Sequence, residues 1–288
     1  MNGQVPEMAN IAALHIYPVK SCRGIDLATA CLGRAGLEAD GVGDREWMVV
    51  DAGSGGFLTQ REAPRMALIV PAIEAGQLVL RAPGMAAVAI ALGEFALRQP
   101  GLAVRVWNHA CMAFDEGDAV AAWLSDFLGR KLRLARFDPA HKRQSNRERT
   151  GSVEALNRFS DGYPLLIIAE ASLADLNDRL QEAGREPLPM NRFRPNIVLG
   201  QVGPFDEDRL VSLSTAGFAL TLVKPCPRCP IPSVDQASGM RGPDPLDILG
   251  QYRDDPDLGV VFGQNVIVAR GYGSTLEVGQ ALDPEWNF

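Results

Sequence analysis

The nine residues KPCPRCPIP (224–232) hold two cysteines three positions apart, together with four prolines and two cations. Such a pair can form a thiol–disulfide couple, supply half of a zinc site, or provide one thiolate ligand. The cations Lys224 and Arg228 favour the thiolate, which is the form of cysteine that binds metals. Because prolines restrict the backbone, this loop could present a soft thiolate to a soft or high-valent metal.

Two of the alternatives fit the surrounding sequence poorly. A thioredoxin-like couple needs its second cysteine in the first turn of a helix, but Pro230 and Pro232 follow Cys229 here, and Ile231 is directed toward extended backbone by the proline after it. A zinc site needs at least three protein ligands, whereas the other cysteines and the three histidines are scattered singly along the chain. A pair of buried, inert thiols stays open as an alternative.

Composition limits the class of protein. The chain has 288 residues and a net charge of −7, which argues against a generally basic nucleic-acid-binding protein. Its N-terminal segment lacks the pattern of a signal peptide, and its apolar runs are too short to span a bilayer. The five cysteines have no disulfide-framework spacing, so a reducing cytoplasm is expected.

Short strand-like runs separated by turns make up most of the sequence, beginning with 11–19 and 45–51. Apolar residues at helical spacing predict a helix over 118–128 that ends at Gly129. A second helix is predicted to start at Ser172, acting as its cap. We therefore predict a mainly β fold with a few helices (α+β), arranged as two packed β-barrel-like units at 8–133 and 134–284.

A polar, basic segment, HKRQSNRERTGS (141–152), follows the first predicted helix. The common interpretation of such a segment is a solvated loop. The alternative is an electropositive lip for an anionic ligand or an acidic partner, formed by four cations: Lys142, Arg143, Arg147 and Arg149.

Seven ordered blocks give the chain a resemblance to the MOSC family (molybdenum-cofactor sulfurase C-terminal domain) with its N-terminal β-barrel partner. Within that family the chain is most similar to the mitochondrial amidoxime-reducing components and their bacterial relatives. The blocks extend over nearly the whole chain: YPVKSCRG (17–24), DREWMVVD (44–51), LTQREAPRMALI (58–69), SDGYPLLIIAEASLADLN (160–177), NRFRPNIVL (191–199), CPRCPIPSVDQASG (226–239) and FGQN (262–265).

The resemblance implies a molybdenum–pyranopterin cofactor (Mo-molybdopterin) with a terminal phosphate. Cys229 would ligate the metal and take part in catalysis, while Cys226 would be a neighbour. A phosphate needs cations and hydrogen-bond donors close together, which Lys20, Ser21 and Arg45 could supply. The full set of implied cofactor contacts is Lys20, Ser21, Arg45, Asp161, Gly162, Tyr163, Arg194, Asn196, Pro227, Arg228, Cys229 and Asn265.

Four positions depart from that pattern or extend it. Gly162 and Tyr163 stand where small hydroxyl residues are common in the family, so only backbone contacts are implied there. Asn265 occupies a position often held by an aromatic residue. Asp235 lies six residues after Cys229, and we expect it either to support the groups that bind the metal or to act in proton delivery.

By resemblance, the expected activity is the pyridoxal phosphate-independent reduction of N-hydroxylated compounds (amidoximes, hydroxylamines and N-hydroxylated bases). Because the sequence has no C-x4-C-x2-C cluster motif, electrons would come from a separate ferredoxin, flavodoxin or cytochrome-type donor protein and its reductase. We expect no nucleic-acid or membrane partner. The alternatives are a sulfur carrier or molybdenum-cofactor-handling protein with a Cys229 persulfide, and a non-catalytic β-barrel binding module.

Overall fold

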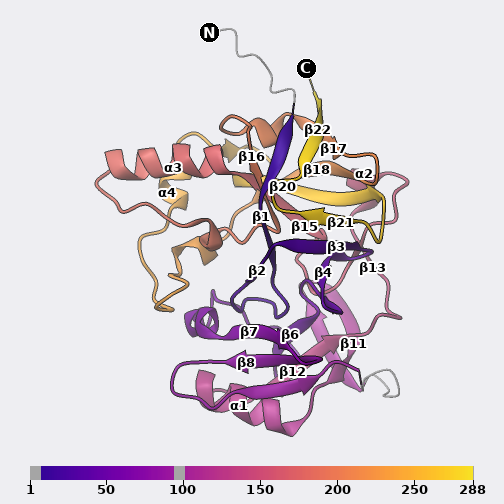
Figure 1. The fold of residues 1–288 in the computed structure, drawn as a ribbon. Helices are drawn as coiled ribbons and strands as arrows, with labels where there is room; N and C mark the ends of the chain where they lie inside the picture. The colour runs from indigo at the N-terminus through magenta and orange to yellow at the C-terminus, as the bar shows by residue number, and fades with distance from the viewer. Residues whose placement is uncertain (1–7, 94–100, 288) are drawn as a thin grey trace.

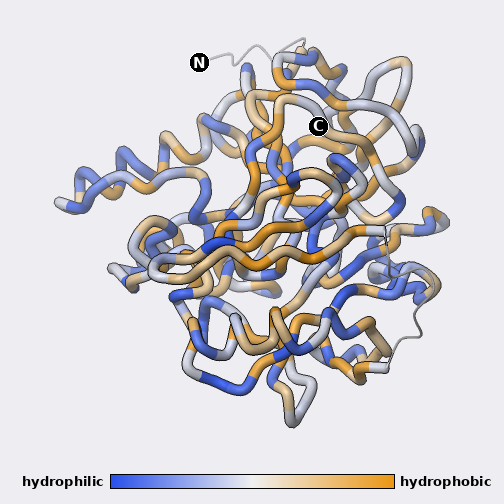
Figure 2. Tube along the Cα trace, turned by 60° about the horizontal axis from the view of Figure 1, so that its bottom comes forward, coloured by the Kyte–Doolittle hydropathy of each residue, from blue (hydrophilic) through white to orange (hydrophobic). Residues whose placement is uncertain are grey.

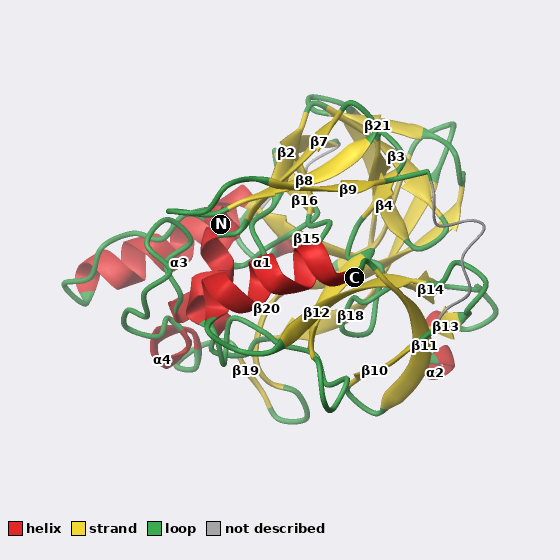
Figure 3. Cartoon of the chain, turned by 90° about the horizontal axis from the view of Figure 1, so that it is seen from below, coloured by secondary structure: helices red, strands yellow, loops and turns green. Residues whose placement is uncertain are grey.

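The computed structural model describes residues 8–93 and 101–287 and is built mainly from β-strands. It contains a closed seven-stranded barrel, at the top of Figure 1, and a curled half-barrel below it. Figure 3 shows how strongly strands predominate over helices. The predicted mainly β fold with two packed barrel-like units is therefore confirmed.

Hydrogen-bond pairing closes the larger barrel, because the last strand of the series, β20, pairs back with the first, β15. Only β15 and β16 are parallel in this series. In spatial order the strands are β15 (Leu165–Ala169), β16 (Ile197–Gly200), β1 (Ala9–Ile16), β22 (Ala281–Trp286), β17 (Leu210–Ser214), β18 (Ala219–Pro227) and β20 (Gly259–Arg270). Short strands β2 (Ile25–Leu27) and β19 (Asp254–Asp255) extend it at β1 and β20.

Strand β1 comes from the start of the chain yet belongs to the barrel formed by the second half. It pairs with β16 on one side and β22 on the other. The barrel core accordingly joins apolar residues from both ends of the chain, including Ile11, Leu14, Ile167 and Val266. The division of the sequence at 133/134 stays a prediction, while in space the first strand belongs to the barrel formed by the second half.

The half-barrel surrounds a second apolar core. One sheet contains β10 (Leu102–Val106), β11 (His109–Asp115), β12 (Leu132–Phe137) and β6 (Trp47–Asp51), and the other contains β7 (Val70–Glu74), β8 (Gln77–Arg81) and β9 (Val88–Ala91). Helix α1 (Asp118–Leu128) buries Val120, Leu124 and Phe127 in this core. It ends at Gly129 in the left-handed conformation, as predicted.

Smaller elements connect the units. A further sheet contains β21 (Thr275–Glu277), β3 (Thr29–Gly33), β4 (Gly36–Ala39) and β5 (Val42–Gly43), and a hairpin contains β13 (Arg143–Gln144) and β14 (Leu156–Asn157). The other α-helices in the described residues are α2 (Arg147–Thr150), α3 (Glu170–Glu182) and α4 (Leu246–Leu249). In Figure 2 the long extended segments near the centre of the trace are mostly apolar (orange). Among the described residues, no helix has the length and hydropathy needed to cross a membrane.

The predicted cap of α3 was wrong. The helix begins at Glu170, so Ser172 lies inside its first turn and is buried. Its hydroxyl donates to Glu207 (2.7 Å) and accepts from the Phe205 amide (2.8 Å). Glu207, which is fully buried, also accepts from the Ala169 amide (3.3 Å) at the helix start. A carboxyl group distant in sequence thus satisfies this helix end, which sequence spacing could not reveal.

Glu207 should make the stability of the fold pH-dependent. Burial raises the pKa of its carboxyl group from 4.5 to about 7. Between these values the folded protein keeps a proton that the unfolded chain releases, so the free energy of unfolding falls as pH rises. Glu207→Gln mimics the protonated group. We expect it to match the wild type near pH 4.5 and to exceed it by up to about 3 kcal/mol above pH 7.

Denaturant titrations of both proteins at a series of pH values measure this difference directly. Comparing the variant with the wild type cancels the contributions of other titrating groups. A constant difference across the whole pH range would contradict the assigned role of Glu207.

Candidate functional site

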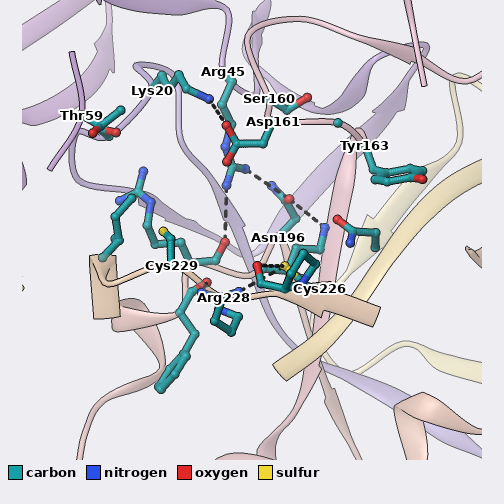
Figure 4. Close-up of a pocket in the computed structure, with 18 of the residues that line it drawn as sticks. Lys20, Arg45, Thr59, Ser160, Asp161, Tyr163, Asn196, Cys226, Arg228 and Cys229 are labelled. Carbon is teal, nitrogen blue, oxygen red and sulfur yellow. Dashed lines mark hydrogen bonds and ion pairs between the residues drawn. The ribbon is translucent and has the colours of Figure 1, made fainter. Parts of the chain in front are cut away.

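A pocket lies where the end of the barrel meets the half-barrel, and its walls come from both (Figure 4). All of the cofactor contacts implied by the sequence line it: Lys20, Ser21, Arg45, Asp161, Gly162, Tyr163, Arg194, Asn196, Pro227, Arg228, Cys229 and Asn265. It has further lining residues that the sequence analysis did not single out: Thr59, Arg61, Ser160, Leu165, Leu166, Phe193 and Ile231. Cys226, expected as a neighbour, also lines it.

The pairing of β1 with β16 brings the first of these groups together. Leu14 pairs with Ile197, so the end of β1 lies beside the residues that precede β16. The Tyr17 hydroxyl consequently donates to the Pro195 carbonyl (3.0 Å). Arg45 and Arg194 place their guanidinium groups within 4.4 Å and 4.2 Å of the Tyr17 ring centre. Burial raises the pKa of Tyr17 to about 12, so its hydroxyl stays protonated.

Lys20 is buried on the pocket wall. Its ammonium donates to the Phe159 carbonyl (2.8 Å) and to the Asp161 carboxylate (2.6 Å). Burial lowers the pKa of Lys20, while the ion pair with Asp161 opposes that effect. Desolvation acts to raise the pKa of Asp161, but Lys20 and the indole N–H of Trp107 outweigh it and hold this pKa well below its usual range. The ion pair therefore stabilises the charged form of each partner against the desolvation that burial imposes.

Arg45 is held in place by a carboxylate and an amide. It forms an ion pair with the buried Asp44 (2.5 Å), and its guanidinium donates to the Asn196 side-chain oxygen (3.2 Å). That oxygen also accepts from the Leu166 amide (3.1 Å), and the Asn196 side-chain nitrogen donates to the His15 carbonyl (3.2 Å). Asn196 therefore orients Arg45 and joins three segments.

Three lining residues other than glycine adopt the left-handed backbone conformation: Ser21 (φ 66°), Arg45 (φ 48°) and Arg194 (φ 60°). This conformation costs a non-glycine residue free energy and persists only where the surrounding structure enforces it. Its occurrence at three points of one pocket shows that the fold maintains strained backbone to place these side chains.

Arg194 contains a buried donor without an acceptor. Its terminal nitrogen Nη2 has no hydrogen-bond partner in the described part of the chain. Burial lowers the pKa of this guanidinium to about 10, and the group remains charged at neutral pH. Leaving a buried charged donor unpaired is costly. An anion or a hydrogen-bond acceptor in the pocket would relieve that cost.

The two cysteines of the opening motif occupy different environments. Cys226 lies near the end of β18, and its sulfur accepts from Arg228 (3.4 Å), whose other nitrogen donates to the Phe193 carbonyl (2.8 Å). Cys229 follows β18 and faces the pocket (Figure 4). Within the described residues no hydrogen bond engages the Cys229 thiol, and no cysteine forms a disulfide. The pair is thus neither a disulfide nor two equivalent thiols.

The loop at 158–163 is fixed from outside the pocket. Arg143 is buried, and its guanidinium donates to the backbone carbonyls of Arg158 (2.8 Å), Ser160 and Asp161 (2.8 Å). The Gly162 carbonyl accepts from Asn157 (3.1 Å). Arg143 therefore does not belong to an exposed basic lip, although Lys142, Arg147 and Arg149 are exposed.

The side chains of two predicted site residues, Asp235 and Asn265, hold neighbouring backbone segments in place. Asp235 does not line the pocket; its carboxylate accepts from the Ser238 amide (2.7 Å) and forms an ion pair with Arg192 (2.8 Å). These bonds stabilise the charged form, so the pKa of Asp235 is lowered. Asn265 does line the pocket, but its amide nitrogen donates to the Lys224 (3.2 Å) and Pro225 (3.3 Å) carbonyls and fixes β20 to β18.

These groups are suited to an anionic metal cofactor. One unengaged thiol lies in a pocket with five cations, and the buried Arg194 lacks an acceptor. A zinc site is not supported, since the described residues contain no group of three or more histidine, cysteine or acidic side chains placed to bind a metal. A cofactor that needs only one protein ligand and carries negative charge matches this donor set.

Comparison with known proteins identifies the family to which the chain belongs. Residues 8–131 match the model of the MOSC N-terminal beta barrel domain, and residues 155–283 match that of the MOSC domain. Mitochondrial amidoxime reducing component 2 of Rattus norvegicus is 32% identical over 256 residues, covering 87% of this chain and 74% of that protein. Mitochondrial amidoxime-reducing component 1 of Homo sapiens is 31% identical over 289 residues, covering 96% and 83%.

A third relative is larger. Molybdenum cofactor sulfurase of Bos taurus is 30% identical over 258 residues, which make up 85% of this chain but 29% of that protein. With both family models matched in order and these relatives aligned over most of its length, the chain belongs to the MOSC family and combines a MOSC N-terminal β-barrel domain with a MOSC domain.

Proposed function

We propose that this protein is a molybdenum-cofactor oxidoreductase that reduces N-hydroxylated compounds such as amidoximes. One structural observation carries the proposal: the unengaged Cys229 thiol shares a cationic pocket with the unpaired Nη2 of Arg194. The names of the relatives supply the reaction class, since two of them are amidoxime-reducing components.

Each lining group has a defined task in this proposal. Cys229 would ligate molybdenum, and Lys20, Ser21 and Arg45 would hold the terminal phosphate. Arg194 and Arg228 would donate hydrogen bonds to the pterin. When bound, the molybdenum–pyranopterin supplies the two-electron chemistry: an amidoxime takes up two electrons and two protons and yields an amidine and water.

The protein residues contribute charge and orientation rather than a proton. Among the described lining residues Asp161 is the only carboxylate, and its low pKa keeps it ionised. It balances Lys20 and is a poor proton donor near neutral pH. Asp235 has its carboxylate engaged outside the pocket. We therefore expect solvent to supply the protons, and we assign Asp235 no role in proton delivery.

Turnover requires an electron source. The proposal includes a separate donor of the ferredoxin, flavodoxin or cytochrome type, with its own reductase. Two exposed cations beside the pocket loop, Arg147 and Arg149, are available to an acidic donor surface, while the exposed Lys142 is already paired with Glu154 (3.0 Å). Arg143 is excluded from this surface because it is buried against the loop carbonyls.

A second function is favoured by one observation, the similarity to bovine molybdenum cofactor sulfurase. In that case Cys229 would carry a persulfide and transfer sulfur without reducing an organic substrate. The two functions differ in their bound components. A reductase retains molybdenum, whereas a sulfur carrier retains cyanide-labile sulfur in its place.

Cys229→Ser should remove molybdenum binding and activity without unfolding the chain, because the thiol makes no structural hydrogen bond in the described residues. We expect at least about a 100-fold loss of benzamidoxime reduction with reduced methyl viologen as donor, since serine is a poor ligand for a soft metal. Cys226→Ser is the matched control and should keep most of the metal. Elemental analysis for molybdenum and zinc, together with thermal unfolding, measures each protein.

Unchanged molybdenum content and turnover in Cys229→Ser would contradict the assignment. Equal losses in both variants would instead indicate that the two thiols act as a pair. Cyanide-labile sulfur without molybdenum in the wild type would favour the carrier function.

Lys20→Met should weaken retention of the cofactor while conserving most of the side-chain volume. A hydrogen bond to a charged group is worth about 1.5–3 kcal/mol, so we expect at least a roughly 10-fold faster loss of molybdenum on dilution. Lys131→Met, at an exposed lysine outside the pocket, is the control. If both variants retained molybdenum as the wild type does, the phosphate would have to bind elsewhere.

A further inference from the structure

Three of the five pocket cations are already paired with neighbouring groups, and a fourth, Arg194, has a buried unpaired donor that is assigned above to the pterin. Lys20 pairs with Asp161, Arg45 pairs with Asp44, and Arg228 donates to the Phe193 carbonyl and to Cys226. Arg194 is buried against Tyr17. The fifth cation, Arg61, comes from the half-barrel. It differs from the others because it is only half-buried and its terminal nitrogens face the pocket unpaired within the described residues.

Arg61 has no carboxylate partner among the described residues. Its Nε donates weakly to the Thr59 hydroxyl (3.4 Å), and its guanidinium lies 4.7 Å from the centre of the Trp107 ring. No described residue accepts a hydrogen bond from the terminal nitrogens of Arg61. The side chain is half-buried and lines the pocket, so these donors are available to a ligand.

The loop that carries Arg61 is rigidly connected to the loop after Cys229. Gln60 and Gln236 are buried and exchange two amide hydrogen bonds (2.9 and 3.1 Å). The Arg61 carbonyl also accepts from the Arg241 guanidinium. Because both loops border the same pocket, this connection fixes the Arg61 backbone relative to Cys229. A charged group on a preorganised loop binds a ligand with little further ordering.

Trp107, under Arg61, occupies a strained position. It is the first residue of the two-residue turn between β10 and β11, where Val106 pairs with His109. Its φ of 54° is of the kind that favours glycine at this turn position. A bulky side chain with this backbone conformation is an outlier. The contacts that the Trp107 side chain makes explain why a tryptophan occupies this position.

The Trp107 side chain reaches the pocket wall on two sides. Its indole N–H donates to Asp161 (2.9 Å), the same oxygen that Lys20 binds, and its ring supports the Arg61 guanidinium. Phe57 packs edge-on against the ring at 5.1 Å. The indole nonetheless remains 44% exposed. It therefore connects the half-barrel turn to two lining residues and orients Arg61.

We propose that Arg61 is a substrate-specificity residue that binds an anionic group, a carboxylate or a phosphate, on the N-hydroxylated substrate. Trp107 is its positioning residue. The inference rests on the proposed reductase function and narrows its substrate class to anionic compounds. A guanidinium binds such oxyanions through two parallel hydrogen bonds, and in a half-buried pocket this bond discriminates against a neutral analogue.

The test compares 4-carboxybenzamidoxime with benzamidoxime on the molybdenum-loaded enzyme, using reduced methyl viologen as donor. We expect the wild type to show at least about a 10-fold higher kcat/KM for the carboxylate, mainly through KM. Arg61→Gln should bring this ratio close to one while retaining molybdenum. Arg105→Gln, at an exposed arginine on β10 outside this pocket, is the matched control and should keep the wild-type ratio.

Two Trp107 variants separate positioning from folding. Trp107→Gly relieves the left-handed strain, which offsets part of the lost ring contacts, so thermal unfolding should show a folded protein, yet it should lose the carboxylate preference. Trp107→Phe keeps a ring beneath Arg61 and should retain part of the preference. If Trp107→Gly kept the full preference, the positioning role of Trp107 would be overturned.

Calorimetric binding of the products, 4-carboxybenzamidine and benzamidine, tests Arg61 independently of turnover. Tighter binding of the carboxylate that disappears in Arg61→Gln supports the inference even if neither amidoxime is reduced, in which case the reductase proposal alone fails. An equal ratio in wild type and Arg61→Gln rules out a carboxylate as the anionic group and leaves only the phosphate tested below. Loss of molybdenum from Arg61→Gln also overturns it, because Arg61 would then hold the cofactor.

Inorganic phosphate as a competitor distinguishes the two anions. Stronger inhibition of the wild type than of Arg61→Gln by phosphate, with little carboxylate preference, supports a phosphate-bearing substrate. Absence of both effects overturns the proposal.

Discussion

The pairing of β1 with β16 is the constraint on which the pocket depends. It places the end of the first strand beside the residues preceding Ile197, so that Tyr17 meets Pro195 and the two arginines that flank its ring. Lys20 follows within the same loop and reaches Asp161 on the far side. Without the first strand in the barrel, the cations of the N-terminal segment would have no fixed position relative to Cys229.

The electrostatics of the pocket follow from this arrangement. Several cations are brought together in a partly desolvated space, and burial lowers the pKa values of Lys20 and Arg194. Asp161 offsets only part of the positive charge. The fold tolerates an unpaired guanidinium nitrogen and three left-handed non-glycine residues at one place. Such local costs are concentrated at functional sites in folded proteins, and a bound anion would offset them.

Periodicity alone predicted much of the fold. The helix at 118–128 and its end at Gly129 could be predicted because both depend only on residues within that segment. The cap of α3 was not, since Glu207 approaches it from 38 residues away. Nor could alternation of apolar residues show that β1 belongs to the barrel of the second half, because partner choice depends on long-range pairing.

For the site, the ordered blocks identified residues that the fold does bring to one pocket, but not what each side chain does there. Asn196 orients Arg45, and Asn265 fixes β20 to β18. Thr59 and Arg61 lay within a recognised block, LTQREAPRMALI, and could have been considered. Trp107 lay in no such block, and its role depends on a turn conformation that the sequence does not display.

The most direct test of the central claim is X-ray absorption at the molybdenum edge on the loaded protein, comparing the wild type with Cys229→Ser loaded at high cofactor concentration. If Cys229 is the single protein ligand, the variant should show one sulfur scatterer fewer around molybdenum, replaced by a lighter atom. An unchanged sulfur shell would show that the metal is not bound by Cys229 and would contradict the account.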